Sequence, residues 1–169
     1  AGAGVADFSL DIGLIEGHGH HPSLVVYPWL HDELVLVTAP QGGPGLDPAA
    51  PVSLAQLRDA VWLLRESGSG TRETGDQSIL PQLHAYRRVI ELGSSEAIKQ
   101  AAAAGLGVAC LSRWVVRDFL RQGLLQELLT PLPPIQRRFF CVLQHGKVVT
   151  PALARLLHHL GCEPHGHES

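Results

Sequence analysis

The sequence contains no methionine, only two lysines and no long apolar run. A membrane-spanning helix needs about 20 consecutive apolar residues, so we expect no membrane partner, and no signal-peptide pattern opens the chain. The 13 lysines and arginines are scattered and are outnumbered by 16 acidic residues, giving a net charge of -3. This balance offers no electrostatic basis for the chain itself to bind DNA. Because even position 1 is not methionine, we expect a fragment or a processed product.

Cysteine and histidine are too sparse or too poorly placed to predict a disulfide framework or a metal centre. The three cysteines are an odd number, and two lie in apolar strand-like runs, so we expect reduced core residues in a cytoplasmic protein. His18, His20 and His21 share a loop, but no cysteine pair lies nearby to complete a four-ligand site. Between positions 32 and 144 the only histidine is His84, which leaves no evident base for a nucleophile. We therefore predict no cofactor, no metal and no catalytic residue.

One polar, glycine-containing loop interrupts the apolar pattern in the middle of the chain. The apolar run 61–64 ends just before it and a helix-compatible segment begins at position 71, which predicts a buried strand, a tight turn and a helix start. The first N–H groups of a helix lack partners within the helix, and the helix dipole there favours negative charge. Glycines allow a ligand to approach the backbone closely, and hydroxyls and a guanidinium add donors. The candidate anion-binding residues are Ser67, Gly68, Ser69, Gly70, Thr71 and Arg72.

Three better-known motifs do not fit this loop. A P-loop requires lysine directly after its last glycine, whereas Gly70 is followed by Thr71. A nucleophile elbow requires glycine two residues before its serine, where this sequence has Ser67. A dinucleotide fingerprint requires a third glycine where Glu73 stands. The plain alternative, in which the serines only cap a helix, stays open at this point.

A second loop further along the chain repeats the same arrangement. Gly93 follows a predicted strand, 88–92, and Ser94 and Ser95 open a predicted helix with Ser94 as its N-cap. Ligands of open α/β sheets bind at the carboxyl ends of strands, so two such loops can face one site. Ser94 and Ser95 therefore join the candidate residues, and an ordinary serine cap stays the alternative here too.

Apolar runs alternate with segments of helical periodicity along most of the chain. Expected strands are 10–15, 24–30, 33–39, 61–64, 88–92, 108–111 and 139–143. Expected helices follow Ser53, Gly70, Ser94, Ser112 and Thr150. We expect the second of these helices to weaken by Gly75 or to stop at Pro81. The alternation predicts an α/β fold.

Several segments, in this order, resemble the effector-binding domain of LysR-type transcriptional regulators. They are 11–14, 34–37, 53–54, 64–72, 91–101 and 104–109. No single segment is decisive, but their order and spacing together are specific. The match extends over almost the whole chain, from about position 5 to about position 160.

The resemblance implies a two-lobe α/β fold like that of type 2 periplasmic binding proteins. It implies a partial lobe I in 1–39, lobe II in 40–129, a return crossover with the C-terminal part of lobe I in 130–162, and a disordered tail in 163–169. It also implies that the first lobe is truncated at its N-terminus and that the family's helix-turn-helix domain is missing. Promoter DNA would then be bound only through that missing domain.

The resemblance further implies an effector sensor without catalysis. A small anion such as sulfate, sulfite, phosphate or a carboxylate would lie between the lobes and accept hydrogen bonds from the serines and from backbone N–H groups. Arg72 would add charge or orient its loop. The full-length homo-oligomer would transmit lobe closure to its DNA-binding heads. A solute-binding protein of a transporter shares the fold and stays the alternative.

Overall fold

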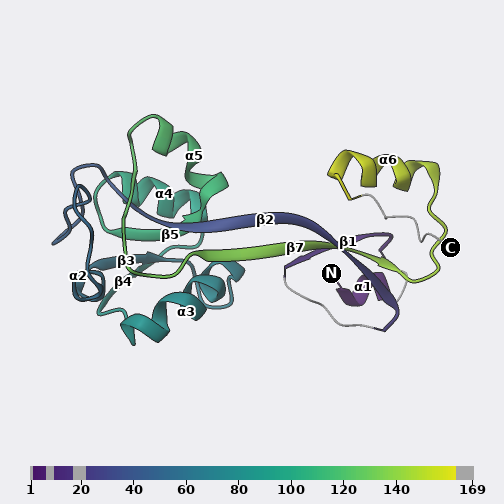
Figure 1. Cartoon of the computed structure of the whole chain (residues 1–169), viewed down its shortest axis with the longest axis horizontal. Coiled ribbons are helices and arrows are strands. Elements are labelled where there is room, and N and C mark those ends of the chain that lie inside the picture. Colours follow the sequence, from purple (N-terminus) through teal and green to yellow (C-terminus); the bar gives the residue numbers. More distant parts are fainter. Residues whose placement is uncertain (1, 7–9, 17–21, 163–169) are drawn as a thin grey trace. The chain divides into compact units, whose positions relative to one another are not determined.

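The computed structural model describes residues 2–6, 10–16 and 22–162 (Figure 1). The predictions made for His18, His20, His21 and the tail 163–169 lie outside these described residues.

The chain divides into two compact units. Unit 1 consists of Ala1–His31 and Arg137–Ser169, and unit 2 consists of Asp32–Gln136. Strands β2 (Leu24–Thr38) and β7 (Ile135–Gln144) each contribute residues to both units (Figure 1). The lobe boundaries expected from the sequence, at 39/40 and 129/130, stay predictions.

The sheet of unit 2 is built around three parallel strands. Strand β3 (Val61–Leu64) lies between β4 (Arg88–Glu91) and β5 (Val108–Ser112), and both neighbours run parallel to it. Strand β2 pairs antiparallel with β5, and a short strand that the sequence did not predict, β6 (Gln126–Glu127), pairs antiparallel with β2. The carboxyl ends of β3, β4 and β5 therefore share one edge of the sheet.

Four helices cover the two faces of this sheet (Figure 1). The helices are α2 (Leu54–Asp59) and α3 (Gly70–Leu83) on one face, with α4 (Ser95–Ala103) and α5 (Arg113–Arg121) on the other. Successive strand residues point to opposite faces, so Trp62 and Leu64 belong to the first hydrophobic core and Leu63 to the second. Near-continuous apolar strands are typical of a sheet buried on both faces. The predicted α/β fold is confirmed.

Unit 1 contains the remaining elements. They are α1 (Gly2–Ala6), β1 (Gly13–Glu16), part of β2, part of β7 and α6 (Pro151–Leu160). Strand β1 pairs antiparallel with β7, and Leu153 and Leu157 of α6 pack with Cys141 and Cys162. All three cysteines of the chain are free and buried, as the sequence predicted.

Side-chain caps explain where four of the helices begin. The hydroxyls of Ser53, Ser94, Ser112 and Thr150 each accept a hydrogen bond from a backbone N–H in the first turn of the following helix. Ser53 and Gln56 complete a reciprocal capping box. The sequence predicted these four starts correctly.

The predicted end of the helix that follows Gly70 was wrong. Helix α3 continues through Gly75 and Pro81 to Leu83. Gly75 is buried, and a Cβ atom there would lie 3.5 Å from Cys110 Sγ, an ordinary van der Waals distance, so the helix packs on β5 at this position. Pro81 lacks the N–H that would donate to the carbonyl of Gln77, and α3 ends two residues after it.

Several predicted strands also had wrong boundaries, the first being 10–15, which begins only at Gly13 in β1. The expected strands 24–30 and 33–39 form one strand, β2, in which Pro28 is exposed and its fixed φ is compatible with extended backbone. The last strand, predicted as 139–143, begins earlier and includes Arg137, whose guanidinium lies 3.7 Å from Glu16. The polar residues at the start of β7 made this part of the sequence look unlike a strand. Ion pairing with the neighbouring strand offsets the cost of placing them there.

Candidate functional site

The two predicted loops lie at the carboxyl ends of adjacent parallel strands. Leu64, the last residue of β3, is aligned with Glu91, the last residue of β4. The N–H of Leu92 also donates to the carbonyl of Leu64, at 2.9 Å, which holds the two chain exits together. The structure thus brings the loops 65–70 and 92–95 side by side, as the ligand-binding edge of an open α/β sheet requires.

The first loop makes a tight turn into α3. Gly68 has φ +90°, in the left-handed region that favours glycine, and open space surrounds the position that a Cβ would occupy. Ser69 is the N-cap residue, and its carbonyl accepts from Glu73 N–H at 2.9 Å. Ser69 is buried as a residue, at 9% exposure, and its side chain makes no capping hydrogen bond. Unlike the other serine caps, this hydroxyl is not used to begin its helix.

The second loop uses its hydroxyls within the protein. Ser94 Oγ accepts from the N–H of Ala97 at 3.0 Å and so caps α4. Ser95 Oγ accepts from Arg65 Nη1 at 3.2 Å, which joins the second loop to the first. A serine hydroxyl that accepts one hydrogen bond still has its own proton to donate.

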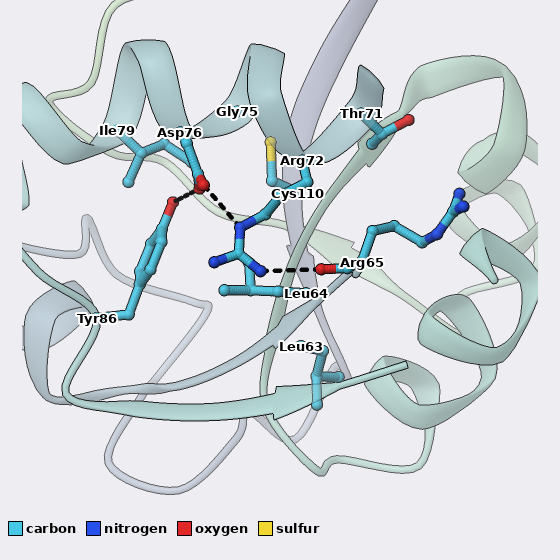
Figure 2. Close-up of a pocket in the computed structure, with 10 residues that line it drawn as sticks. All are labelled: Leu63, Leu64, Arg65, Thr71, Arg72, Gly75, Asp76, Ile79, Tyr86 and Cys110. Atoms are coloured by element: carbon cyan, nitrogen blue, oxygen red, sulfur yellow. Dashed lines mark hydrogen bonds and ion pairs between the residues drawn. The ribbon is translucent and has the colours of Figure 1, made fainter. Parts of the chain in front are cut away.

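Arg72 is held inside the first loop and does not project from it. Its Nε donates to Asp76 Oδ2 at 2.6 Å and its Nη1 donates to the carbonyl of Arg65 at 2.9 Å, as Figure 2 shows. Tyr86 donates its hydroxyl proton to the other carboxylate oxygen of Asp76, at 2.7 Å. Burial, together with this hydrogen bond, raises the pKa of Tyr86 well above its ordinary value. Of the two roles expected for Arg72, this geometry fits the orientation of the loop.

The pocket behind the loop is too small for a metabolite. It lies between α3 and the strands β3 and β5, and its ten lining residues are drawn in Figure 2. The cavity volume is about 10 Å³, on the scale of a single water molecule. In Figure 2 the Arg65 guanidinium and the Thr71 hydroxyl point away from the Arg72, Asp76 and Tyr86 side chains that fill it. This cavity therefore has no room for a ligand larger than water, and a ligand that binds the loop would have to lie on the outer side, away from the cavity.

Sequence reasoning missed the cation that lies on this outer side. Arg65 Nε and Nη2 each donate to one carboxylate oxygen of Glu66, both at 2.7 Å. These hydrogen bonds from Arg65 lower the pKa of the Glu66 carboxyl to about 2. The signal was present in the sequence, since Arg65 is the first polar residue after a buried strand that ends at a ligand-binding edge.

Residues 2–6, 10–16 and 22–162 contain no group of three or more histidine, cysteine or acidic side chains placed to hold a metal ion. Within the same ranges, none of the helices has the length and apolar character that crossing a bilayer requires.

Known proteins similar to this chain are mostly regulators of transcription. Residues 2–163 match the family model described as "LysR substrate binding domain". The HTH-type transcriptional regulator YeiE of Escherichia coli K12 is 45% identical over 162 residues, which are 95% of this chain and 53% of YeiE. The phosphonates import ATP-binding protein PhnC of Anaeromyxobacter dehalogenans is 33% identical over 159 residues, which are 92% of this chain and 31% of PhnC.

A solved structure supports the same assignment. The Synechocystis CcmR regulatory domain, in complex with 2-PG, is 28% identical, with a TM-score of 0.75 over 94% of this chain and 75% of the CcmR chain. This chain spans about half the length of YeiE and less of PhnC. The family match, which covers nearly every residue, and the shared fold of regulatory domains agree. The chain therefore belongs to the LysR substrate-binding-domain family and has its type 2 periplasmic-binding-protein-like fold.

Proposed function

We propose that this chain is the effector-sensing domain of a LysR-type transcriptional regulator and that it binds a small anionic metabolite or oxyanion. One observation carries the proposal: two hydroxyl-bearing helix starts lie at the carboxyl ends of adjacent parallel strands, and Arg65 bridges them through Ser95. Sulfate, sulfite, phosphate and small carboxylates are the anions whose chemistry suits these donors.

Each candidate residue has a role that its geometry supports. Gly68 and Gly70 let the anion approach the backbone at the start of α3, where N–H groups and the helix dipole favour negative charge. Ser67, Ser69 and Thr71 add hydroxyl donors from the first loop, and Ser94 and Ser95 add them from the second. Arg72 fixes the first loop through the carbonyl of Arg65. The complex of CcmR with 2-PG supports a small ligand as the effector class.

Signalling in the proposed regulator is a shift between conformations. An effector that binds one conformation better than another biases the equilibrium by that difference in affinity, and a full-length homo-oligomer transmits the bias to its DNA-binding domains. A net charge of -3 gives this chain no electrostatic attraction to DNA, so we assign DNA binding to the rest of the full-length protein. We place this regulator in the cytoplasm, acting as a sensor without catalysis.

The proposal is tested by thermal unfolding in the presence of anions. An anion at about 100 times its Kd stabilises the native state by about 2.7 kcal/mol, which corresponds to roughly 5–10 °C for a chain of this size. Sulfate, sulfite, phosphate and acetate are compared with chloride at equal ionic strength. Thr71→Val, which keeps the shape of the side chain and removes a donor, should reduce the shift.

Thr74→Val is the matched control, because it makes the same change one turn further into α3. It should leave the anion-dependent shift unchanged. If no anion raises the melting temperature beyond chloride, or if both threonine variants reduce the shift equally, the proposed site is wrong.

A solute-binding role in transport is the second candidate function. The relative named for transport is PhnC, which is the ATP-binding protein of phosphonate import and of which this chain covers 31%. The full-length gene product separates the two candidates. A regulator binds its own promoter region with an affinity that the anion changes, whereas a transport component shows no preference for promoter over scrambled duplex.

A further inference from the structure

We propose that Arg65 is the residue that binds the anionic group of the effector and that Glu66 is a built-in competitor for the same guanidinium edge. This inference rests on the proposed function and narrows its ligand class to oxyanions that present two oxygens to one guanidinium. The effector would replace the Glu66 carboxylate, and Glu66 would turn out into solvent.

The geometry of the Arg65–Glu66 pair is that of ligand recognition. Nε and Nη2 of Arg65 meet the two oxygens of one carboxylate at equal distances of 2.7 Å. This parallel two-bond arrangement is the one that arginine uses for carboxylate and phosphate groups. The Glu66 carboxylate occupies the Nε–Nη2 edge of Arg65. An external oxyanion can occupy the same edge in its place.

Arg65 is held by partners outside the pair and is the less exposed of the two residues. The carbonyl of Arg65 accepts from Arg72, and its Nη1 donates to Ser95, so both ends of the residue are held. The Arg65 side chain is 23% exposed, whereas the Glu66 side chain is 45% exposed. The carboxylate can leave at low cost because an exposed ion pair contributes little net free energy.

The location of Arg65 fits the rest of the proposed site. Its guanidinium reaches from the end of β3 to the first residue of α4, and so lies between the two loops. It points to the outer side of the first loop, as the Thr71 hydroxyl does (Figure 2). An oxyanion bound to Arg65 can therefore receive further hydrogen bonds from the loop hydroxyls.

The internal competitor also sets selectivity. The apparent affinity for the anion equals the intrinsic affinity multiplied by the fraction of molecules in which Glu66 does not occupy Arg65. Chloride cannot form two parallel hydrogen bonds, so it displaces Glu66 poorly, whereas sulfate, phosphate and carboxylates reproduce both bonds. The pair thus favours planar or tetrahedral oxyanions over simple halides.

Glu66→Gln removes the competing charge and keeps the length of the side chain. Calorimetry with sulfate, sulfite, phosphate and acetate should show about two- to fivefold tighter binding than in the unchanged protein, since exposed ion pairs span that range. Glu96→Gln is the matched control, because it removes one exposed negative charge at the start of α4 that pairs with Lys99 and not with Arg65. It should change affinity less than Glu66→Gln does.

Arg65→Lys keeps the positive charge but removes the guanidinium edge that donates two parallel hydrogen bonds. It should weaken anion binding at least tenfold. The Arg65 Nε–H resonance in heteronuclear NMR should shift on anion addition in the unchanged protein. An anion that binds without moving this resonance, or whose affinity both variants leave unchanged, overturns the role of Arg65 while the proposed function stands. An absence of binding in the unchanged protein and in Glu66→Gln overturns both.

Discussion

The two helix starts at the edge of unit 2 look alike in sequence and differ in how they use serine. The Ser94 hydroxyl oxygen accepts a hydrogen bond from the N–H of Ala97 in α4, at 3.0 Å. Ser69 stands at the equivalent N-cap of α3, yet its side chain makes no capping bond. The first loop is held by an arginine network, through Arg72, and the second by its own cap.

This difference separates a hydroxyl that caps its helix from one that does not. A loop that is already fixed by buried side chains can leave its hydroxyl donors available to a ligand. A loop that depends on its serine for the helix start cannot change that serine without losing stability. We therefore predict that removing a hydroxyl from the first loop will change the free energy of unfolding little but will lower the anion affinity.

The largest expected effect comes from removing the network that fixes the first loop. Arg72→Met deprives Asp76 of its charged partner and Arg65 of the donor to its carbonyl. Because both charged groups are largely buried, we expect a loss of about 2–3 kcal/mol in the free energy of unfolding, together with weaker anion binding. Urea unfolding followed by circular dichroism measures the first effect.

Arg117→Met is the control for that experiment, since Arg117 lies half-exposed on α5 with its nearest carboxylate 3.8 Å away. It should change stability by less than about 0.5 kcal/mol. Equal losses in the two variants would show that the Arg72 network does not hold the loop.

An intermediate effect distinguishes the two serine caps directly. Ser94→Ala should cost about 1 kcal/mol in the free energy of unfolding, because it removes a side-chain cap. Ser69→Ala should cost clearly less, because no capping bond is lost. Anion affinity should show the reverse order and fall more in Ser69→Ala. If Ser69→Ala destabilises the protein as much as Ser94→Ala, the distinction between the loops fails.

The smallest expected effect is the pH dependence of the Arg65–Glu66 pair. The folded-state pKa of Glu66, about 2, lies below the ordinary value of 4.5, so the pair stabilises the fold above pH 4.5 and loses this contribution as the pH falls toward 2. Glu66→Gln should therefore have a slightly flatter decline of stability between these pH values. Urea unfolding at stepped pH gives the two curves, and parallel curves would show that the pair contributes nothing to stability.

Local signals in the sequence were strong enough to locate most elements and both loops. The apolar run 61–64 is β3, and the cap residues Ser53, Ser94, Ser112 and Thr150 begin the helices predicted for them. Errors occurred where neighbours in space override local preference. Glycine weakens an isolated helix by about 1 kcal/mol, but in α3 the buried packing of Gly75 against Cys110 keeps the helix intact.

In the candidate site, too, local signals were visible in the sequence and contacts between distant residues were not. The sequence proposed residues 67–72 and 94–95 as candidates, because unpaired N–H groups at a helix start favour anions and hydroxyls add donors. It could not determine that Arg72 points inward to Asp76 and the carbonyl of Arg65, since the partners of a long side chain depend on which strands lie beside it.

The sequence by itself determined the alternation of strands and helices, the buried cysteines and the two hydroxyl-bearing loops, because each depends on side-chain polarity and on backbone preferences over a few residues. Only the tertiary structure decided that these loops are neighbours, because the alignment of Leu64 with Glu91 is made by hydrogen bonds between strands far apart in sequence. It also decided that Arg65 joins the two loops while Arg72 turns to Asp76, since Ser95 reaches Arg65 only after β3 and β4 have paired.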